Sequence, residues 1–352
     1  MENRRSGPLA DSSTANTLLS LERVSVHGRP LWDILEQHRV WLQGRPEGVR
    51  VCLSDVVLAD VNLQKASLKR AVIRSVSFID SNLQGVDLSE AELEDVDFRN
   101  ASLVGVDFSE AELSKVNFQH AWLAEANFSD AKVSESLFHR ANMRELRAFE
   151  ARFRLCDLTG TDMSGASLNH ASFDQCQLVD VELGVANLLR TRFQLSRLSG
   201  AVLDGAKLDT AHILDCDCRG IQAAGARFAG ANLSRSDFSR ARMRGCDFRR
   251  CDLTSAEFGQ ATLAESMMGD ANLSAADFRG ADLEGVRELI GPQLLRSLTS
   301  GLTKLPSGAA GPYLKGSGAE KPARPQTKEE AKAPSPWKPP GSHPSPSRMW
   351  RR

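Results

Sequence analysis

The sequence predicts a repeat protein that winds as a four-sided solenoid, and three observations predict it. An apolar residue returns at every fifth position for 47 consecutive repeats, from Leu53 to Leu283, without an insertion. A column of small residues, mostly Ala, Val, Ser and Cys, lies two positions before each of them. Fourteen of the 15 Phe stand in the large column, and each has another Phe 20 residues away. A period of five fits neither a helix nor a strand, whereas four such repeats make one coil with four sides.

The repeat A-(N/D)-(L/F)-x-x, seen at residues 126–130 and 271–275, resembles the pentapeptide-repeat family. The resemblance covers about two-thirds of the chain and implies an all-β fold, a right-handed four-sided parallel β-helix. The 47 repeats would make about 12 coils. With coils spaced like neighbouring strands, at about 4.8 Å, the body would be on the order of 55 Å long. The resemblance specifies function poorly, because one kind of solenoid hosts many roles.

The N-terminal part is expected to cover the open first coil. Residues 1–20 are polar and rich in Ser and Thr, so we expect them to be disordered. Residues 21–50 would form a cap that contains a short amphipathic helix between Pro30 and Gly44. Its apolar face would consist of Leu31, Leu35, His38 and either Trp41 or Leu42. His38 is interpreted as a packing residue rather than a catalytic one.

The β-helix itself is assigned to residues 51–285. No proline lies within it, so we expect a straight rod without an inserted domain. At Leu146/Ala148 and again at Ile221/Ala223, the large residue moves into the small column, which conserves interior volume. Phe149 is then left on an outward position. Local repacking is the simpler interpretation of these exchanges, and a bend or a contact point is the alternative.

The C-terminal part is assigned to a short cap and a tail. Residues 286–305 would form a helical cap, opened by Pro292, with Leu294, Leu295 and Leu298 on one face. Residues 306–352 hold ten of the 14 prolines together with many Ser, Lys and Gly, and are expected to be a disordered basic tail. Two P-x-x-P sequences, at 322–325 and 336–339, match ligands of aromatic grooves. The candidate tail motif is Pro336, Trp337, Pro339 and Trp350.

The cysteines are expected to be buried free thiols. Five of the seven occupy the small column and Cys218 stands in the large one. A metal site at Cys216, Cys218 and His212 is disfavoured, because zinc ligands prefer a wider spacing and His212 falls on an outward position. Neither a metal nor a cofactor is therefore expected. Free thiols suit a reducing compartment, so we expect a cytoplasmic protein, with export without a cleaved signal as the alternative. No apolar run is long enough for a membrane span.

Charge is unevenly distributed along the chain. The whole chain has a net charge of −1, whereas residues 51–145 alone carry −7. The 20-residue period stacks many carboxylates on adjacent coils. A solvated face is the simple interpretation, and a surface for a basic partner is the functional one. The candidate interaction surface is Asp87, Glu90, Glu92, Glu94, Asp95, Asp107, Glu110, Glu112, Asp130 and Glu150.

The sequence predicts an interaction protein rather than an enzyme. It lacks a nucleophile elbow, a phosphate loop and a metalloprotease helix, and a filled solenoid has no cavity for a small-molecule substrate. We therefore expect a non-enzymatic scaffold or adaptor, such as a bacterial effector, that binds protein partners through its walls and tail. The family resemblance implies an alternative, a DNA mimic that binds DNA gyrase or topoisomerase through its acidic wall. The modest net charge departs from that pattern, as does a basic cluster at Arg240, Arg242, Arg244, Arg249 and Arg250.

Overall fold

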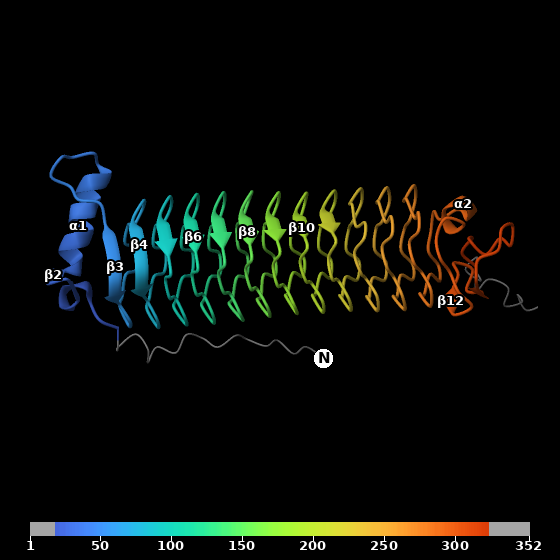
Figure 1. Ribbon diagram of the computed structural model, residues 1–352, viewed down its shortest axis with the longest axis horizontal. Helices are drawn as coiled ribbons and strands as arrows, with labels where there is room; N and C mark the ends of the chain where they lie inside the picture. Colours follow the sequence, from blue (N-terminus) through green and yellow to red (C-terminus); the bar gives the residue numbers. More distant parts are fainter. Residues whose placement is uncertain (1–17, 324–352) are drawn as a thin grey trace, which may run out of the picture. The chain divides into compact units, whose positions relative to one another are not determined.

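The described residues form a parallel β-solenoid, which confirms the predicted fold class. The computed structural model describes residues 18–323, and the chain winds in coils of 20 residues stacked along one axis (Figure 1). A nine-stranded parallel sheet follows one wall, and each residue pairs with the residue 20 positions later, as Phe173 does with Phe193. Its strands are β3 (Cys52–Val57), β4 (Val72–Ser77), β5 (Glu92–Glu94), β6 (Glu112–Ser114), β7 (Lys132–Ser134), β8 (Arg152–Arg154), β9 (Ser172–Asp174), β10 (Arg192–Gln194) and β11 (His212–Leu214).

The coils continue beyond the last of these strands. Single parallel bridges at the same spacing join His212 to Asn232, Asn232 to Asp252, and Asp252 to Asn272. The sheet therefore accounts for nine rungs of this wall, and three more rungs are single bridges. The other walls are held by bridges of the same kind, such as Asn62 with Asn82.

The corners of the coil impose a demanding backbone conformation. Every fifth residue from Asp55 to Gly285 has a positive φ. Glycine, Asn and Asp adopt this left-handed region most readily, whereas a branched side chain is strained there. Gly and Asp are accordingly common at the corners, where the chain turns from one wall to the next.

The interior is filled by the two apolar columns. The Phe rings stack from coil to coil, as Phe78 does on Phe98 with centroids 5.2 Å apart and planes 8° apart. Neighbouring Phe columns meet edge to face, as Phe98 and Phe108 do at 6.3 Å. Each stacked or edge-to-face pair contributes about 0.5–1.5 kcal/mol beyond its buried area. Six of the seven cysteines are buried free thiols, as predicted, and Cys52 is exposed.

The two exchanges of large and small residues leave the coil in register. Leu146 and Ala148 are both fully buried, and the bridges from Asn127 to Arg147 and on to Ser167 are unbroken. The same holds at Ile221 and Ala223. The structure therefore favours local repacking over a bend. Phe149 is 46% exposed on the outer wall, in agreement with its predicted outward position.

A helix covers the N-terminal end, as predicted. The helix α1 (Leu31–Leu42) follows η2 (Leu21–Arg23) and the hairpin of β1 (Ser25–Val26) and β2 (Arg29–Pro30). His38 is fully buried, and its Nδ1 accepts a hydrogen bond from the Val51 amide at 3.0 Å while its Nε2 lies 2.9 Å from the Lys69 carbonyl. The predicted disordered segment 1–20 extends too far, because Leu19 pairs with Val61 of the first coil.

The predicted C-terminal helix is shorter than expected. The helix α2 (Gly291–Leu294) buries Leu294, whereas Leu295 and Leu298 are about half exposed. The helix ends early because the following chain extends to pair with the last coil. There Leu298 bridges Asp277, and its carbonyl accepts a hydrogen bond from the Phe278 amide at 2.8 Å. Backbone pairing therefore replaces the predicted apolar helix face as the main cover of this end.

The assignment of a disordered tail from residue 306 is wrong for its first part. Residues 306–323 are folded, and β13 (Ala310–Gly311) in this segment pairs antiparallel with β12 (Thr303–Lys304) just before it. Leu305 and Tyr313 are buried in the hydrophobic core at this end of the solenoid. The Pro- and Gly-rich composition of the segment had instead indicated disorder. The candidate tail motif lies outside the described residues. In the described part of the chain, neither helix has the length and apolar content that a membrane span requires.

Candidate functional site

The structure brings the predicted acidic residues together on adjacent coils. Glu90, Glu110, Asp130 and Glu150 occupy successive positions of one corner, each with φ between 55° and 60°. Asp87 bridges Asp107 on one side of this corner, and Glu92 pairs with Glu112 on the other. The geometric part of the prediction therefore describes the wall correctly.

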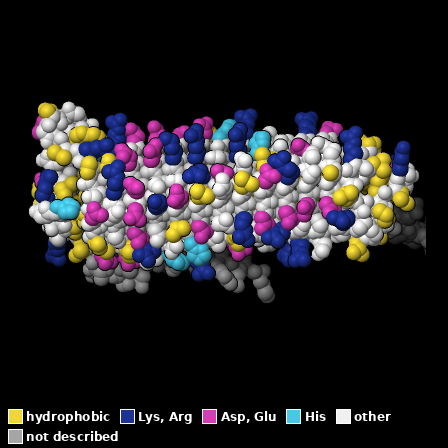
Figure 2. All heavy atoms as spheres, viewed as in Figure 1, with side chains coloured by type: hydrophobic (Ala, Val, Ile, Leu, Met, Phe, Trp, Pro, Cys, Tyr) yellow, Lys and Arg dark blue, Asp and Glu magenta, His cyan; other side chains and the backbone are white. Residues whose placement is uncertain are grey.

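Much of that acidic charge is paired within the chain. Glu90 lies 2.9 Å from the Lys69 ammonium and 2.8 Å from Arg70, and the hydrogen bond from Lys69 holds the pKa of Glu90 below its usual range. Lys132 lies 2.7 Å from Glu112. Arg50 and Arg74 pair with Glu92, and Arg74 also pairs with Glu94. On the face shown in Figure 2, acidic and basic side chains accordingly lie interspersed over the first coils.

The remaining acidic candidates divide into two groups. Asp87, Asp95 and Asp107 accept hydrogen bonds from neighbouring Ser or Asn side chains, as Asp107 does from Asn127 at 2.9 Å. Glu110, Asp130 and Glu150 make no side-chain hydrogen bond or ion pair within residues 18–323. This corner column is therefore the part of the predicted surface whose charge is available to a partner.

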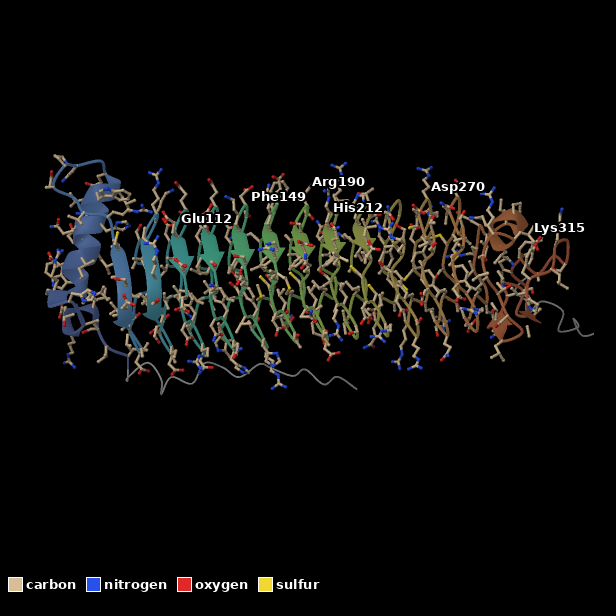
Figure 3. The ribbon with its side chains drawn as sticks, in the orientation of Figure 1. Glu112, Phe149, Arg190, His212, Asp270 and Lys315 are labelled. Atoms are coloured by element: carbon tan, nitrogen blue, oxygen red, sulfur yellow. The ribbon has the colours of Figure 1, made fainter. Side chains whose placement is uncertain are left out.

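A second feature lies on the same wall and begins at the coil where the acidic column ends, and sequence reasoning missed it. Arg152 on β8, Arg192 on β10 and the corner residue Arg190 are exposed, and none of them forms an ion pair within the described chain. Arg152 stands in register between Lys132 and Ser172, and Arg192 between Ser172 and His212. Together with His170 and Glu150, these side chains line an open hollow of about 370 Å³. Figure 3 shows Arg190 and His212 on this side of the rod.

Exposed apolar side chains border these arginines. Leu155 and Leu195 stand at the corner that directly follows β8 and β10. Their side chains are 41% and 54% exposed, and their φ angles are 55° and 50°. Across the opposite corner, Phe149 meets the His170 ring edge to face, with centroids 5.5 Å apart. We call Phe149, Arg152, Leu155, Arg190, Arg192 and Leu195 the β8–β10 face. Two carboxylates, Glu150 and Asp174, lie beside this face, and its three arginines outnumber them.

The predicted basic cluster near the far end does not form one patch. Arg244 pairs with Glu265 and Arg249 with Asp247, which leaves less free charge than the sequence suggests. Arg242 bridges Gln222 on one wall, whereas Asp247, the partner of Arg249, bridges Arg227 on another. The five arginines are therefore distributed around the coil.

No metal centre is present in the part of the chain that the structure describes, since no three His, Cys, Asp or Glu side chains converge there. Cys216 and Cys218 point into the core, and burial raises the pKa of the Cys216 thiol to about 11. His212 lies on the outer wall. The three residues of the disfavoured metal site are thus not brought together.

Comparison with known proteins agrees with the repeat architecture. A family model described as a pentapeptide repeat region matches residues 51–128. A second, described as pentapeptide repeats in eight copies, matches residues 136–175, 149–184, 216–254 and 256–287. No curated protein matches the chain.

Solved structures of similar proteins also match. One is HetL, a pentapeptide repeat protein involved in heterocyst differentiation regulation from the cyanobacterium Nostoc. Its sequence is 22% identical, the match covers 78% of this chain and 97% of HetL, and the TM-score is 0.22. Another is full-length QnrB1, a plasmid-mediated fluoroquinolone resistance protein, with 15% identity, 72% and 93% coverage, and a TM-score of 0.20. These low scores bear on neither function nor partner. The two family models together span more than half of the chain, and the chain belongs to the pentapeptide-repeat family.

Proposed function

We propose that this protein is a non-enzymatic scaffold that binds other proteins through the outer walls of its solenoid. The observation that supports this proposal is the complete filling of the interior. The large column is buried along the solenoid, from Leu53 at 3% exposure to Leu283 at 0%. Most acidic and basic side chains of the solenoid stand on its outward walls, where the hollows are open to solvent. Catalysis usually needs a concave and partly dry pocket, whereas ordered columns of side chains suit recognition of a surface.

The proposal is tested by capturing partners with the immobilised full-length protein and with a version that ends at residue 323. Specific partners retained by both versions would support binding through the solenoid walls. Partners retained only by the full-length protein would place recognition in the tail, including the candidate motif around Trp337. The absence of any specific partner for either version would contradict the scaffold proposal.

One observation favours binding to DNA gyrase or topoisomerase as a second candidate. The corner column of Glu110, Asp130 and Glu150 presents carboxylates that no basic side chain of residues 18–323 neutralises. The pairing of Glu90 and Glu112 with basic side chains counts against this candidate. The two candidates differ in a gyrase supercoiling assay, with and without a quinolone. The scaffold proposal expects no effect at micromolar protein, and inhibition or protection there would favour the second candidate.

A further inference from the structure

The arginines of the β8–β10 face differ from most arginines nearby on the rod. Arg197, Arg219 and Arg235 each lie within ion-pair distance of an Asp, as Arg235 does from Asp215 at 2.7 Å. By contrast, Arg152, Arg190 and Arg192 have no carboxylate partner within residues 18–323, although Glu150 lines the same hollow. Their neighbours in register, Lys132, Ser172 and His212, supply no carboxylate either. These guanidinium groups are therefore free to pair with carboxylates that another molecule supplies.

The corner leucines are the second, independent observation. Among the 47 left-handed corner positions, bulky apolar side chains occur only at Leu155, Val185 and Leu195. Each is exposed, so burial does not offset the conformational cost of a branched side chain in this region. Residues held in sparsely populated backbone regions at a conformational cost cluster at binding and active sites. Two of the three border the arginines of the β8–β10 face, and Val185 lies on a different corner.

We propose that the β8–β10 face binds an acidic segment of a partner protein. The carboxylates of that segment would pair with Arg152, Arg190 and Arg192, and its apolar side chains would pack against Leu155, Leu195 and Phe149. Arginine and aromatic residues are enriched in protein interfaces. The exposed leucines favour a protein over a nucleic acid, because a phosphodiester backbone offers no apolar surface to an aliphatic side chain. This inference rests on the proposed scaffold function and names the class of its partner.

The first test uses a displayed library of random 16-residue peptides, selected on the full-length protein. The expected winners are rich in Asp and Glu and also contain Leu or Phe. Their affinities are then measured by fluorescence anisotropy with the wild-type protein and with Arg152→Glu/Arg192→Glu. Because charge reversal places carboxylates opposite carboxylates, binding should weaken at least ~10-fold. The proposal would be overturned if the selected peptides lacked acidic residues, if no peptide were selected, or if the variant bound the peptides as tightly as the wild-type protein.

A matched control separates this face from general electrostatics. Arg240→Glu/Arg242→Glu changes the net charge by the same amount, at arginines that also lack an ion pair within the described residues but stand elsewhere on the coil. Binding by this variant should stay within about twofold of wild type, since exposed charges more than about 10 Å away are largely screened at 0.1 M salt. Equal loss in both variants would overturn the assignment to the β8–β10 face. Circular dichroism verifies that both variants are folded.

The apolar part is tested at the corners. Leu195→Asn removes the side chain from the β8–β10 face and replaces it with a residue that tolerates the left-handed region, so it should raise the melting temperature while weakening peptide binding several-fold. Val185→Asn should raise the melting temperature without affecting binding. Unchanged binding by the Leu195 variant would overturn the apolar contact.

The remaining outcomes distinguish this proposal from the scaffold function. A labelled 20-nucleotide single-stranded DNA is tested in the same assay. The choice of a protein partner would be overturned if this DNA bound the wild-type protein more tightly than the peptides do and did not bind the Arg152→Glu/Arg192→Glu variant. Selected peptides that bind another wall would overturn the β8–β10 face and leave the scaffold function intact. The scaffold function itself fails only if the capture experiment also finds no specific partner.

Discussion

The exchange of Leu146 and Ala148 provides a quantitative test of how the solenoid core is packed. Both side chains are fully buried, and the backbone pairs normally through the exchange, with the Ala148 amide 2.9 Å from the Ser167 carbonyl. If the two residues compensate only by volume, then each single change should disturb the core. The double change Leu146→Ala/Ala148→Leu restores the usual order of small and large columns and should be tolerated.

The magnitudes follow from the burial of the two side chains. Leu146→Ala removes a buried leucine without a replacement and should lower the free energy of unfolding by about 2–5 kcal/mol. Ala148→Leu adds volume beside Leu146 and should cost about 1–3 kcal/mol. The double variant conserves total volume and should cost less than about 1.5 kcal/mol. The interaction energy between the two changes should therefore reach at least about 1.5 kcal/mol, well above the ~0.5 kcal/mol expected of independent sites.

Urea denaturation of the four proteins measures this cycle. Far-UV circular dichroism follows the whole solenoid, whereas the fluorescence of Trp122, which bridges Asn142 in the following coil, adds a local signal. The two signals must coincide, because long repeat arrays can unfold in parts. The corresponding cycle at Ile221 and Ala223 serves as an independent repetition. A double variant whose loss equals the sum of the two single losses would refute volume compensation.

Three further predictions concern the ends and the thiols. Burial lowers the pKa of His38, whose Nδ1 must stay unprotonated to accept a hydrogen bond from the Val51 amide. The contribution of this contact to stability should be complete above about pH 6.5 and should decline as the pH falls towards the lowered pKa. His38→Gln should remove this pH dependence of the melting temperature. A thiol reagent at pH 8 should label the exposed Cys52 rapidly and the six buried cysteines only after unfolding. Burial also raises the pKa of Cys246 and of Cys251 to about 12, which disfavours their reactive thiolate form. Rapid labelling of two or more thiols would contradict this prediction. A version ending at residue 307 should melt at a lower temperature than one ending at 323, because it loses Tyr313 and the β12–β13 pair; identical melting temperatures would show that this segment does not stabilise the last coil.

The fold could be predicted because one rule repeats along the whole solenoid. A large residue at every fifth position and Phe at every twentieth determine which side chains point inward, and the pairing of Phe173 with Phe193 follows that rule. The structure of the two ends was harder to predict than that of the coils, because each end occurs once and carries no repeat. There the outcome depended on single anchors, such as Tyr313, within a composition typical of a disordered tail.

The acidic surface shows a different limit of sequence reasoning. The 20-residue period correctly stacked the carboxylates, yet the same period also places Arg70 beside Glu90 and Lys132 beside Glu112. Counting charges of one sign along the wall therefore overestimated its free charge. The signal that could have corrected this was available, because a basic residue 20 or 21 positions away from a carboxylate lies on the neighbouring coil.

The corner column carries the most information about function, because its backbone conformation restricts the residues that suit it. A regular solenoid accepts almost any polar residue on its flat walls, so the composition of a wall says little about selection for binding. At the corners, Gly, Asn and Asp are favoured by the left-handed φ, and a bulky apolar residue is disfavoured both by strain and by exposure. Leu155 and Leu195 are therefore difficult to explain by folding alone, and their position beside Arg152 and Arg192 connects them with recognition. The same comparison of each corner residue with its backbone requirement needs only the sequence, once the period is known.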